Sequence, residues 1–378
     1  MKILLVEPWL SGSHRAWAEG YRASSGHDVD VVGLPGQLWR WRLRGGALPL
    51  AESITNWIDR NGQPDLLLVS GLVDVAELLG LARRNLSPDA GVVIYQHESQ
   101  LVYPVAEGNF DNGAALRNWM SWCAADLVLF NSYHHLRAVS GALPGFIRSL
   151  PDDTHQPSVE NVLSKFEVFP VGVDLRPIPA GGDRRARAER DDRPIILWPH
   201  RWERDKDPGA FLNALDKVRD VGLDFGLVLA GQDPPSGSTM ATEERERAEK
   251  EFADHIVASG DFDRSTYLRH LAEADLVVSC ARHEFFGVAV VEAVAAGCVP
   301  LLPDALSYPE LIRPPWHRTV LYEPGTFGSR LVDAVKRIGE LRNETIGLAE
   351  SMGRYDWGSV GQIYDDRLAA VQSRLATV

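Results

Sequence analysis

The sequence is poor in cysteine, in long apolar runs and in net positive charge. Its three cysteines, Cys123, Cys280 and Cys298, are an odd number at wide spacings, which excludes a complete disulfide framework and a Cys-x-x-Cys metal site. No segment approaches the ~20 consecutive apolar residues that a membrane-spanning helix needs. The formal net charge of −13 argues against a protein that coats nucleic acid with a generally basic surface. We therefore expect reduced, buried thiols in a chain without a membrane partner.

The N-terminal stretch "MKILLVEPWLSGSH" also lacks the features of a secretion signal. Its apolar run is short and leads directly into Glu7 and Pro8. With 45% apolar and 24% charged residues, the composition is typical of a folded globular protein. We predict a cytoplasmic protein, and the sequence offers no evident protein partner.

The chain does contain a regular alternation of strand-like and helix-like segments. Apolar runs without polar alternation are typical of strands covered on both faces, and strand–helix repetition indicates a parallel sheet. The predicted strands are 2–8, 28–35, 64–71, 91–98, 125–132, 165–174, 195–200, 224–231, 274–281 and 298–304. The predicted helices include 73–84, 112–124 and 132–141.

A break in this alternation divides the chain into two predicted domains. A length of 378 residues exceeds what one hydrophobic core usually organises. The stretch 176–194, "RPIPAGGDRRARAERDDRP", combines proline, glycine and clustered charge, as linkers do. We predict an α/β fold with a Rossmann-like, doubly wound domain at 1–178, a linker at 179–194 and a second such domain at 195–356. A last helix at 357–378 has no strand after it.

Residues 138–164 do not fit the alternation, because they are rich in proline and serine and have weak periodicity. We predict an inserted surface loop there, with a disordered segment as the alternative. Open α/β sheets bind ligands beyond the carboxyl ends of their strands. The functional site is therefore expected in the cleft between the two domains, on residues that directly follow strands.

The first candidate motif is "SGSH" at 11–14, between a strand and a helix. Small residues such as Gly12 and Ser13 let backbone N–H groups approach a ligand, and a helix N-terminus favours anionic groups. An ordinary helix start with Ser11 or Ser13 as N-cap is an equal alternative.

The second motif is "YQHESQ" at 95–100, at the end of the fourth predicted strand. His97 and Glu98 are expected to project into the mouth of the cleft. We favour ligand contact over a purely structural histidine because of this position in the topology.

The third motif, "WPHRWERDKDP" at 198–208, follows the first strand of the second half. Arg201 and Lys206 offer two cations that can hold a diphosphate and neutralise a leaving group. A solvated charge cluster is the alternative, because acids are interleaved with the cations. Trp198 and Trp202 read as buried and count against it.

The fourth motif, "HEFFGVAVVE" at 283–292, is predicted as a turn and a helix that ends at Gly297. Glu284 lies in the loop after a strand, and Glu292 lies on the helix. The N–H groups of Gly287 and Val288 at the helix start are expected to receive a phosphate. Two unrelated acids, one near the helix start and one solvated, are the alternative.

A local basic patch is predicted at "LWRWRLR", where arginines alternate with tryptophans. Cations beside aromatic faces suit an RNA backbone and unstacked bases, whereas a strand edge packed by tryptophans is the alternative. The patch comprises Trp39, Arg40, Trp41, Arg42 and Arg44, with His14 and Arg15 as a possible extension. The arginines at 184, 185, 187 and 190 are interpreted as part of a solvated linker.

In this order the four motifs resemble those of the retaining GT-B glycosyltransferases of the family-four type. That family has a glycine-rich N-terminal loop, a histidine in the first domain, an Arg…Lys pair and a Glu-x7-Glu motif. The resemblance covers essentially the whole chain and implies a GT-B fold with an interdomain cleft and a C-terminal helix that crosses back to the first domain. "VFPVGVD" at 168–174 is similar to the segment before the family's linker, with Val171 in place of the common asparagine.

A narrower resemblance is to the tRNA-queuosine mannosyltransferases. It is carried by "LPGQLWRWRLR", "YQHESQLVYPV", "WPHRWERDKDP", "ARHEFFGVAVVEA" and "ALSYPE". The family implies transfer of mannose from GDP-mannose to queuosine at the wobble position of a tRNA for aspartate. The alternatives are a family-four enzyme with another nucleotide sugar and a lipid, glycan or small-molecule acceptor, or a binding module without activity.

The resemblance also implies roles for the donor-site residues. Arg201 and Lys206 would hold the diphosphate, and Glu292 would contact the ribose hydroxyls. Glu284 would hold hydroxyls of the donor sugar, together with the amides that follow Phe286, those of Gly287 and Val288. No metal ion and no cofactor are expected, because the two cations perform a metal ion's work.

On the acceptor side, the resemblance places His97 near the reacting centre. Gly12 and Ser13 would line the phosphate side, and His14 and Glu98 would lie toward the tRNA. Retaining enzymes of this fold are thought to use no protein nucleophile, with the leaving phosphate taking the acceptor's proton. The protein would then contribute positioning and charge stabilisation.

Overall fold

The computed structural model describes residues 1–104, 110–151, 156–178, 193–231 and 239–375. The chain divides into two compact units, one formed by Met1–Val173 with Trp357–Val378 and the other by Asp174–Asp356. Residues 174–178, which we predicted to close the first domain, therefore belong to the second unit. Residues 179–192 of the predicted linker, with all four of its arginines, lie outside the described residues.

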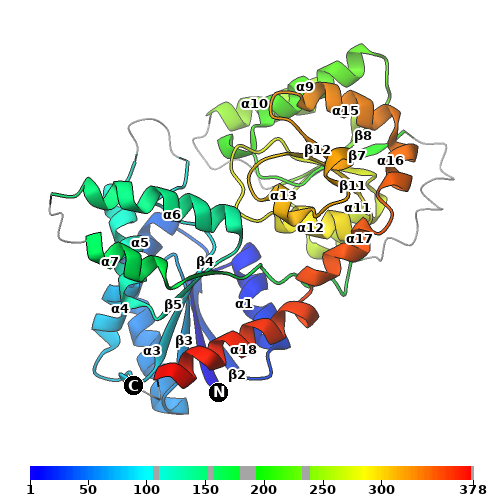
Figure 1. The fold of residues 1–378 in the computed structure, drawn as a ribbon. Helices are drawn as coiled ribbons and strands as arrows, with labels where there is room; N and C mark the ends of the chain where they lie inside the picture. Colours follow the sequence, from blue (N-terminus) through cyan, green and yellow to red (C-terminus); the bar gives the residue numbers. More distant parts are fainter. Residues whose placement is uncertain (105–109, 152–155, 179–192, 232–238, 376–378) are drawn as a thin grey trace. The chain divides into compact units, whose positions relative to one another are not determined.

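The first unit is built on a six-stranded parallel sheet with the order β2-β1-β3-β4-β5-β6 (Figure 1). The strands are β1 (Lys2–Leu10), β2 (Asp28–Pro35), β3 (Leu66–Ser70), β4 (Gly91–Gln96), β5 (Leu127–Phe130) and β6 (Phe166–Val168). The helices are α1 (Gly12–Ser24), α2 (Trp39–Gly45), α3 (Ala47–Asn61), α4 (Val75–Ala82), α5 (Asn112–Ala124), α6 (Tyr133–Arg148), α7 (Gln156–Leu163) and α18 (Trp357–Leu375). All six predicted strands of this half are confirmed.

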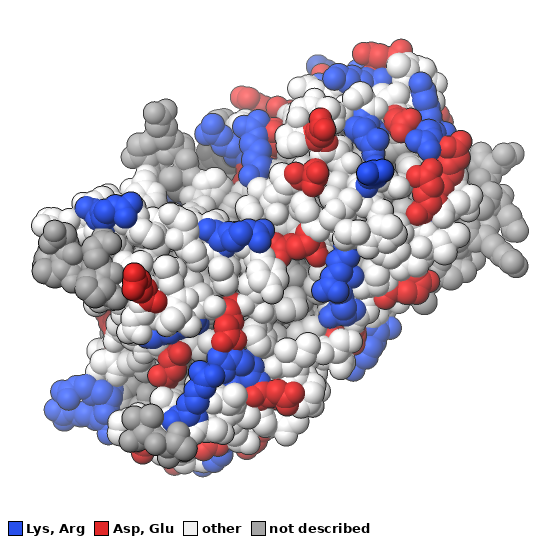
Figure 2. All heavy atoms as spheres, in the orientation of Figure 1, with Lys and Arg blue, Asp and Glu red and all other residues white. Residues whose placement is uncertain are grey.

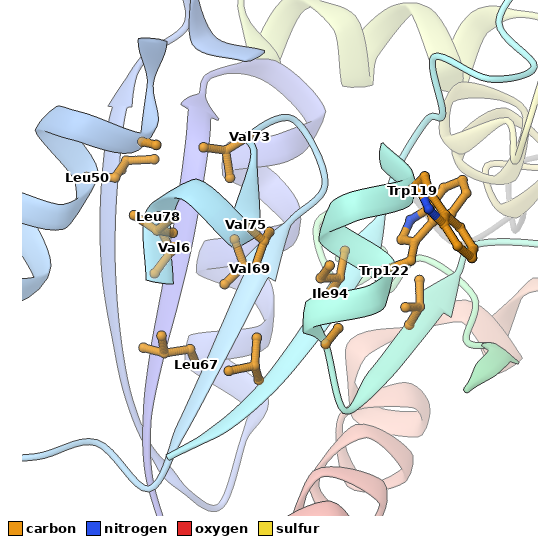
Figure 3. Packing of buried hydrophobic residues seen from close by; sticks show 14 of the residues in the cluster. Val6, Leu50, Leu67, Val69, Val73, Val75, Leu78, Ile94, Trp119 and Trp122 are labelled. Carbon is orange, nitrogen blue, oxygen red and sulfur yellow. The ribbon is translucent and has the colours of Figure 1, made fainter. Parts of the chain in front are cut away.

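The largest part of the core that Figure 3 shows lies between one face of this sheet and helices α3, α4 and α5, and its cluster continues into α6 and α7. Val6 projects from β1 toward Leu78 of α4, Ile94 lies beside α5, and Trp122 of α5 is fully buried. Because the strands are covered on both faces, they are apolar without alternation, which is the pattern that made them visible in the sequence. This packing fixes the positions of the strands, so their carboxyl ends form one well-defined edge of the sheet.

The last helix, α18, belongs to the first unit although it follows the second in sequence. Tyr364 is fully buried and donates to the Pro170 carbonyl at 3.0 Å. The buried Asp365 carboxylate accepts from the Tyr21 hydroxyl at 2.8 Å and from the Ser25 hydroxyl at 2.6 Å. The helix is thus tied to α1 by hydrogen bonds as well as by packing.

The second unit contains another six-stranded parallel sheet, with the order β12-β11-β10-β7-β8-β9. The strands are β7 (Ile195–Trp198), β8 (Gly226–Ala230), β9 (Ile256–Gly260), β10 (Leu276–Val278), β11 (Val299–Pro303) and β12 (Leu321–Tyr322). The helical segments are η2 (Arg204–Lys206), α9 (Pro208–Asp220), α10 (Thr239–Glu251), η3 (Ala253–His255), α11 (Arg264–Glu273), α12 (Val288–Ala295), α13 (Tyr308–Leu311), α14 (His317–Val320), α15 (Phe327–Lys336), α16 (Ile338–Glu344), α17 (Leu348–Ser351) and η4 (Met352–Tyr355). The strand order reverses between β7 and β10, which places a topological switch point at their carboxyl ends.

Two expectations about secondary structure were wrong. The described part of 138–164 is helical: α6 runs on to Arg148 although it contains Pro144, and α7 follows. Pro144 is tolerated because the buried residues of α6, such as Val139 and Phe146, continue a helical face on both sides of it. Strands β9 and β12 were missed. β9 is only partly buried and β12 has two residues, so neither gives a continuous apolar run.

The surface carries both signs of charge. On the face drawn in Figure 2, basic and acidic side chains are interspersed. None of the described helices is long and apolar enough to cross a membrane. The three cysteines are free thiols, and Cys280 and Cys298 are buried whereas Cys123 is half-buried.

Candidate functional site

The first group of functional side chains lies at the carboxyl edge of the first sheet. Glu7 lies in β1, His14 is in the first turn of α1, and His97 directly follows β4. Because parallel strands end at the same edge of a sheet, residues distant in sequence meet there. Among the described residues, these three are the one group of histidine, cysteine and acidic side chains whose ligand atoms all lie within 4.8 Å of one another.

Glu7 occupies the centre of this group and is completely buried. Its Oε1 accepts from the backbone N–H of Trp9 at 2.9 Å and lies 3.1 Å from Nδ1 of His14. Its Oε2 has no hydrogen-bond partner and lies 3.9 Å from Nε2 of His97, which is also buried without a partner. The side chains of His14 and His97 are 15% and 12% exposed, so the pair of rings forms the accessible part of the group.

Burial and neighbouring charge affect the two histidines in opposite directions. Burial lowers the pKa of His14, but the Glu7 carboxylate, with a smaller contribution from Glu98, outweighs it and raises the pKa overall. Burial lowers the pKa of His97 well below its usual value, and His14 and His135 lower it further. The group therefore contains a neutral His97 ring beside a His14 ring whose pKa is raised.

Aromatic rings fix the position of His97. Trp17 stacks on Tyr95 with ring centroids 4.6 Å apart, and His97 meets both rings edge-on at 4.7 and 4.8 Å. The Tyr95 hydroxyl donates to the Phe169 carbonyl at 3.0 Å, and the Asn131 amide donates to the His97 carbonyl at 2.8 Å. The imidazole is thus held by a rigid support.

The helix start next to this group is free of a side-chain cap. Ser11 is the N-cap residue of α1, but its side chain makes no capping hydrogen bond, and Gly12 has a left-handed φ of 50°. Gly12 and Ser13 are both exposed, as the predicted phosphate contact requires. Ser11 therefore occupies the N-cap position, as the alternative predicted, but its side chain does not cap the helix.

The tryptophan–arginine patch forms helix α2 and not a strand edge, so the strand alternative was wrong. Leu43 is buried and anchors the helix, whereas Trp39 is 38% and Trp41 60% exposed. The Arg40 guanidinium lies over the Trp39 ring at 4.8 Å from its centroid. Two of its other arginines have protein partners: Arg42 donates to the Pro35 carbonyl at 3.1 Å and Arg44 pairs with Asp111 at 2.7 Å.

The second group lies in the other unit, at the switch point between β7 and β10. Lys206 ends η2, a short helical turn in the loop after β7, and Glu284 lies in the loop after β10. The Lys206 ammonium lies 3.2 Å from Glu284 Oε2 and 3.1 Å from Asp205 Oδ2, and donates to the His283 carbonyl at 2.9 Å. These contacts use all three ammonium donors. The structure thus brings together Lys206 and Glu284, which were predicted as site residues of separate motifs, with Asp205 as an unpredicted partner.

The charges of this group stabilise one another. Burial lowers the pKa of Lys206, but Glu284 and Asp205 outweigh this effect and raise the pKa overall. Burial raises the pKa of Glu284, but Lys206 and His200 reverse the shift, so the pKa is lowered overall. Burial, with the Lys206 charge, lowers the pKa of His200 to about 4. His200 is consequently a neutral ring whose Nε2 is buried without a hydrogen-bond partner.

Arg201 differs from Lys206 because its side chain is 52% exposed and pairs with Glu203 at 3.2 Å. Trp198 and Trp202 are buried at 0% and 1% exposure, as predicted, and pack with ring centroids 4.8 Å apart. The motif is therefore an anchored loop and not a solvated cluster. Its exposed cation is Arg201 and its buried cation is Lys206.

Helix α12 follows Glu284 closely. The backbone N–H of Phe286 donates to Glu284 Oε1 at 3.4 Å, and Gly287 has a left-handed φ of 103° that suits glycine. No described side chain caps the helix, so the N–H groups of its first turn, which begins at Val288, remain for a ligand. Glu292 lies on the same helix and is 8% exposed, with its carboxylate 2.7 Å from Arg264. Burial raises the pKa of Glu292 although Arg264 opposes the shift.

A pocket of about 250 Å³ lies beside these residues at the ends of β7, β8 and β9. A Cβ at Gly231 would lie 1.9 Å from the His200 carbonyl oxygen, so only glycine permits the close approach of these two segments. The residues that line the pocket are Pro199, Arg201, Ala230, Gly231, Gly260, Asp261, Phe262, Tyr267 and Ala289. Arg201 thus connects the pocket with the third motif.

Sequence reasoning missed several residues of both groups. Glu7 was interpreted only as the end of an apolar run. An acid within a buried strand indicates a polar partner or a site, because glutamate is rarely fully buried unless it is paired. Asp205 was treated as an interleaved acid, and Arg264 lies in no motif. His200 stood in the third motif without an assigned role.

Comparisons with known proteins agree with this architecture. Residues 2–173 match a family model described as tRNA-queuosine alpha-mannosyltransferase N-terminal. Residues 182–355 match a model described as glycosyl transferases group 1. The chain is 33% identical over 318 residues to the tRNA-queuosine alpha-mannosyltransferase of Drosophila melanogaster, covering 82% of this chain and 81% of the relative. It is 24% identical over 214 residues to the GDP-mannose:cellobiosyl-diphosphopolyprenol alpha-mannosyltransferase of Xanthomonas campestris, covering 55% and 54% of the two chains.

Solved structures show the same fold. Starch synthase IV of Arabidopsis thaliana superposes with a TM-score of 0.71 at 12% identity, over 99% of both chains. Sucrose-phosphate synthase of Thermosynechococcus elongatus superposes with a TM-score of 0.69 at 17% identity, over 98% of this chain and 100% of the other. The predicted GT-B fold is confirmed, and the chain is a glycosyltransferase that belongs to the tRNA-queuosine alpha-mannosyltransferase family.

Proposed function

We propose that this glycosyltransferase moves mannose from GDP-mannose to queuosine at the wobble position of tRNA-Asp, with retention of the anomeric configuration. The observation that carries the proposal is the contact of Lys206 with Glu284 beside the uncapped start of α12. A cation and backbone N–H groups suit a diphosphate, and a carboxylate suits the hydroxyls of a sugar. The name of the Drosophila melanogaster relative, tRNA-queuosine alpha-mannosyltransferase, supports queuosine in tRNA as the acceptor and mannose as the transferred sugar.

Diphosphate binding would change the partners of Lys206. Its three donors are already used by Asp205, Glu284 and a carbonyl group, so a phosphate oxygen must replace one of them. Arg201, on an exposed side chain, would approach the same phosphates from the pocket side. Displacement of Glu284 from Lys206 would release its carboxylate toward the sugar, which couples donor binding to sugar recognition.

Asp261 supports guanine as the base of the donor. It is exposed directly after β9 and lines the pocket that Arg201 also lines. A carboxylate accepts two hydrogen bonds side by side. Guanine presents two adjacent donors, N1–H and the N2 amino group, whereas adenine and uracil do not present this pair.

The contacts of Glu284 support retention without a protein nucleophile. Its Oε2 contacts Lys206 at 3.2 Å and its Oε1 accepts from the Phe286 N–H at 3.4 Å. Oε1 thus holds the loop, and the Oε2 that donor binding releases from Lys206 would accept from the sugar hydroxyls instead of attacking the anomeric carbon. The mechanism that we propose uses positioning and charge stabilisation, with the leaving phosphate as the base. We also propose that the reaction needs no metal ion, so activity is expected to persist in a chelator.

The exposed face of α2 supports an RNA acceptor. Trp41 is 60% exposed, and Arg40 stacks on the half-exposed Trp39. Aromatic faces beside guanidinium groups bind unstacked bases and phosphates. This local surface offsets the unfavourable net charge of −13.

A transfer assay with defined acceptors tests the proposal. Mannose from GDP-mannose is expected on tRNA-Asp that carries queuosine, and none on the same tRNA with guanine at the wobble position. NMR of the product is expected to show the α-anomer. Equal labelling of both tRNAs would remove queuosine from the proposal, and a β-linked product would remove retention.

A lipid-linked acceptor is the second candidate. The Xanthomonas campestris relative is named for a polyprenol-linked acceptor, although it matches only 55% of this chain. Polyprenol-diphosphate glycans in detergent are the test substrate. Turnover of these compounds above that of queuosine tRNA would favour this second function.

A further inference from the structure

The completely buried carboxylate of Glu7 is unusual for its surroundings. Glutamate is rarely fully buried without a cation, and here it ends the apolar part of a central strand. One of its oxygens is satisfied by Trp9 and His14, and the other is aimed at a second histidine without a hydrogen bond. A purely structural acid would be expected to satisfy both oxygens.

We propose that Glu7 is a positioning residue for the transfer reaction, because its carboxylate orients His14 and His97 so that the two rings hold the acceptor hydroxyl. This inference rests on the proposed function and adds to it a residue that does not touch the substrate. Oε2 of Glu7 and Nε2 of His97, 3.9 Å apart, need only a small side-chain movement to form a hydrogen bond. Glu7 therefore acts through both rings.

The carboxylate determines which ring nitrogen carries a proton. A carboxylate accepts, so Nε2 of His97 carries the proton toward Glu7 and Nδ1 remains as an acceptor. In the same way Nδ1 of His14, 3.1 Å from Glu7, carries a proton toward the carboxylate. When His14 is doubly protonated, a form that the Glu7 carboxylate favours, its Nε2 is a second donor. The pair thus offers one acceptor and one donor.

A hydroxyl group matches this pair because it donates and accepts at once. The ring centroids of His14 and His97 are 4.1 Å apart, so a single acceptor oxygen can reach both. The Trp17 and Tyr95 rings prevent His97 from turning away. Glu7 would thus contribute to orientation of the acceptor and not to donor binding.

Charged neighbours determine how the protonation of His14 and His97 depends on pH. Glu7 and Glu98 raise the pKa of His14, whereas His14 and His135 lower that of His97. If protonated His14 and neutral His97 are required, activity declines on the alkaline side as His14 loses its proton. Removal of the Glu7 charge lowers the pKa of His14 and moves this alkaline limb to lower pH.

The decisive variant is Glu7→Gln, which keeps the size and loses the charge. We expect kcat to fall about 100-fold. The KM for GDP-mannose should stay within about twofold, because Arg201, Lys206 and Glu284 lie in the other unit. The alkaline limb of the pH–rate profile should move to lower pH. The matched control is Asp365→Asn, another buried carboxylate of the first unit, which bonds Tyr21 and Ser25 and faces no histidine of the group. It should lower thermal stability and leave the pH profile unchanged.

A second variant keeps the test valid if Glu7→Gln is poorly folded. His14→Gln removes the titrating ring and should abolish the alkaline limb. Its effect on kcat should be less than additive with that of Glu7→Gln, because Glu7 acts partly through the His14 ring. An unchanged profile in both variants would leave Glu7 a purely structural role. If the purified enzyme contained stoichiometric zinc and Glu7→Gln lost it, these three side chains would be a metal site, and the positioning role of Glu7 would be contradicted. Absence of mannose transfer by the wild-type enzyme would instead contradict the proposed function, and tRNA binding by the variants would still be measurable.

Discussion

The two units surround their candidate sites with opposite charge arrangements. In the first unit, one carboxylate lies between two imidazoles, and only the rings are accessible. In the second unit, one ammonium lies between two carboxylates and is itself buried. The first arrangement suits a neutral hydroxyl without rearrangement, whereas the second must exchange a partner when an anion binds. Donor binding is therefore the step that we expect to be sensitive to the internal ion pairs.

The strongest test of this difference is Lys206→Met. The variant leaves Asp205 and Glu284 facing each other in a buried site, which costs about 3–5 kcal/mol of stability. Transfer should fall about 1000-fold or more, because a cation for the leaving group is lost. Affinity of the first unit for tRNA should be unchanged.

A double variant and a control variant help to interpret the result for Lys206→Met. Lys206→Met/Glu284→Gln should regain part of the lost stability but no activity, and Lys217→Met, an exposed lysine of the same unit, should resemble the wild type. Thermal denaturation and initial rates supply both readouts. Retention of a tenth of the activity by Lys206→Met would show that the buried ammonium does not serve the phosphates.

A second test concerns the base pocket of the second unit. Asp261→Asn should lower kcat/KM for GDP-mannose about 10- to 100-fold, since a carboxylate hydrogen bond to a buried base contributes about 1.5–3 kcal/mol. The control is Asp263→Asn, which removes the N-cap of α11 two residues away. That control should lower the melting temperature and leave the donor preference intact. If Asp261→Asn kept the wild-type preference for GDP-mannose, guanine would be recognised by other residues.

A third, smaller effect is expected on the RNA side. Arg40→Ala and Trp41→Ala should each raise the KM for tRNA about 3- to 10-fold and leave the KM for the donor unchanged. Arg40→Ala should also reduce the slope of log affinity against log salt by about one. Arg84→Ala, an exposed arginine of the same unit, is the control. Equal losses in all three variants would indicate nonspecific electrostatics instead of a defined α2 contact.

A last test concerns the acid stability of the second unit. The pKa of His200 is lowered from 6.5 to about 4, so the unfolded chain binds this proton at a higher pH than the folded protein does. Stability is consequently lost as the pH falls from 6.5 toward 4. His200→Asn has no such proton, and its melting temperature should decline less over this window. Parallel curves for the two proteins would show that His200 is not the group responsible.

The strands could be predicted because buried parallel strands leave continuous apolar runs, and only β9 and β12 lacked that signal. Lys206 and Glu284, each predicted as a donor-site residue, could be placed because both follow strands that meet at the switch point. Side-chain partners could not be predicted, because they depend on rotamers and on residues without a motif. Asp205, Arg264 and above all Glu7 are such partners, and none of them stands at a spacing that suggests its role.

The hydrogen bonds of α18 also have a consequence for biosynthesis. The first unit needs Tyr364 and Asp365 to complete its packing, but these residues are translated after the whole of Asp174–Asp356. At typical elongation rates, this delay is roughly 10 to 40 seconds. The first unit is therefore completed only after Asp174–Asp356 has been translated, and the Tyr21 side of α1 lacks its α18 partners until then.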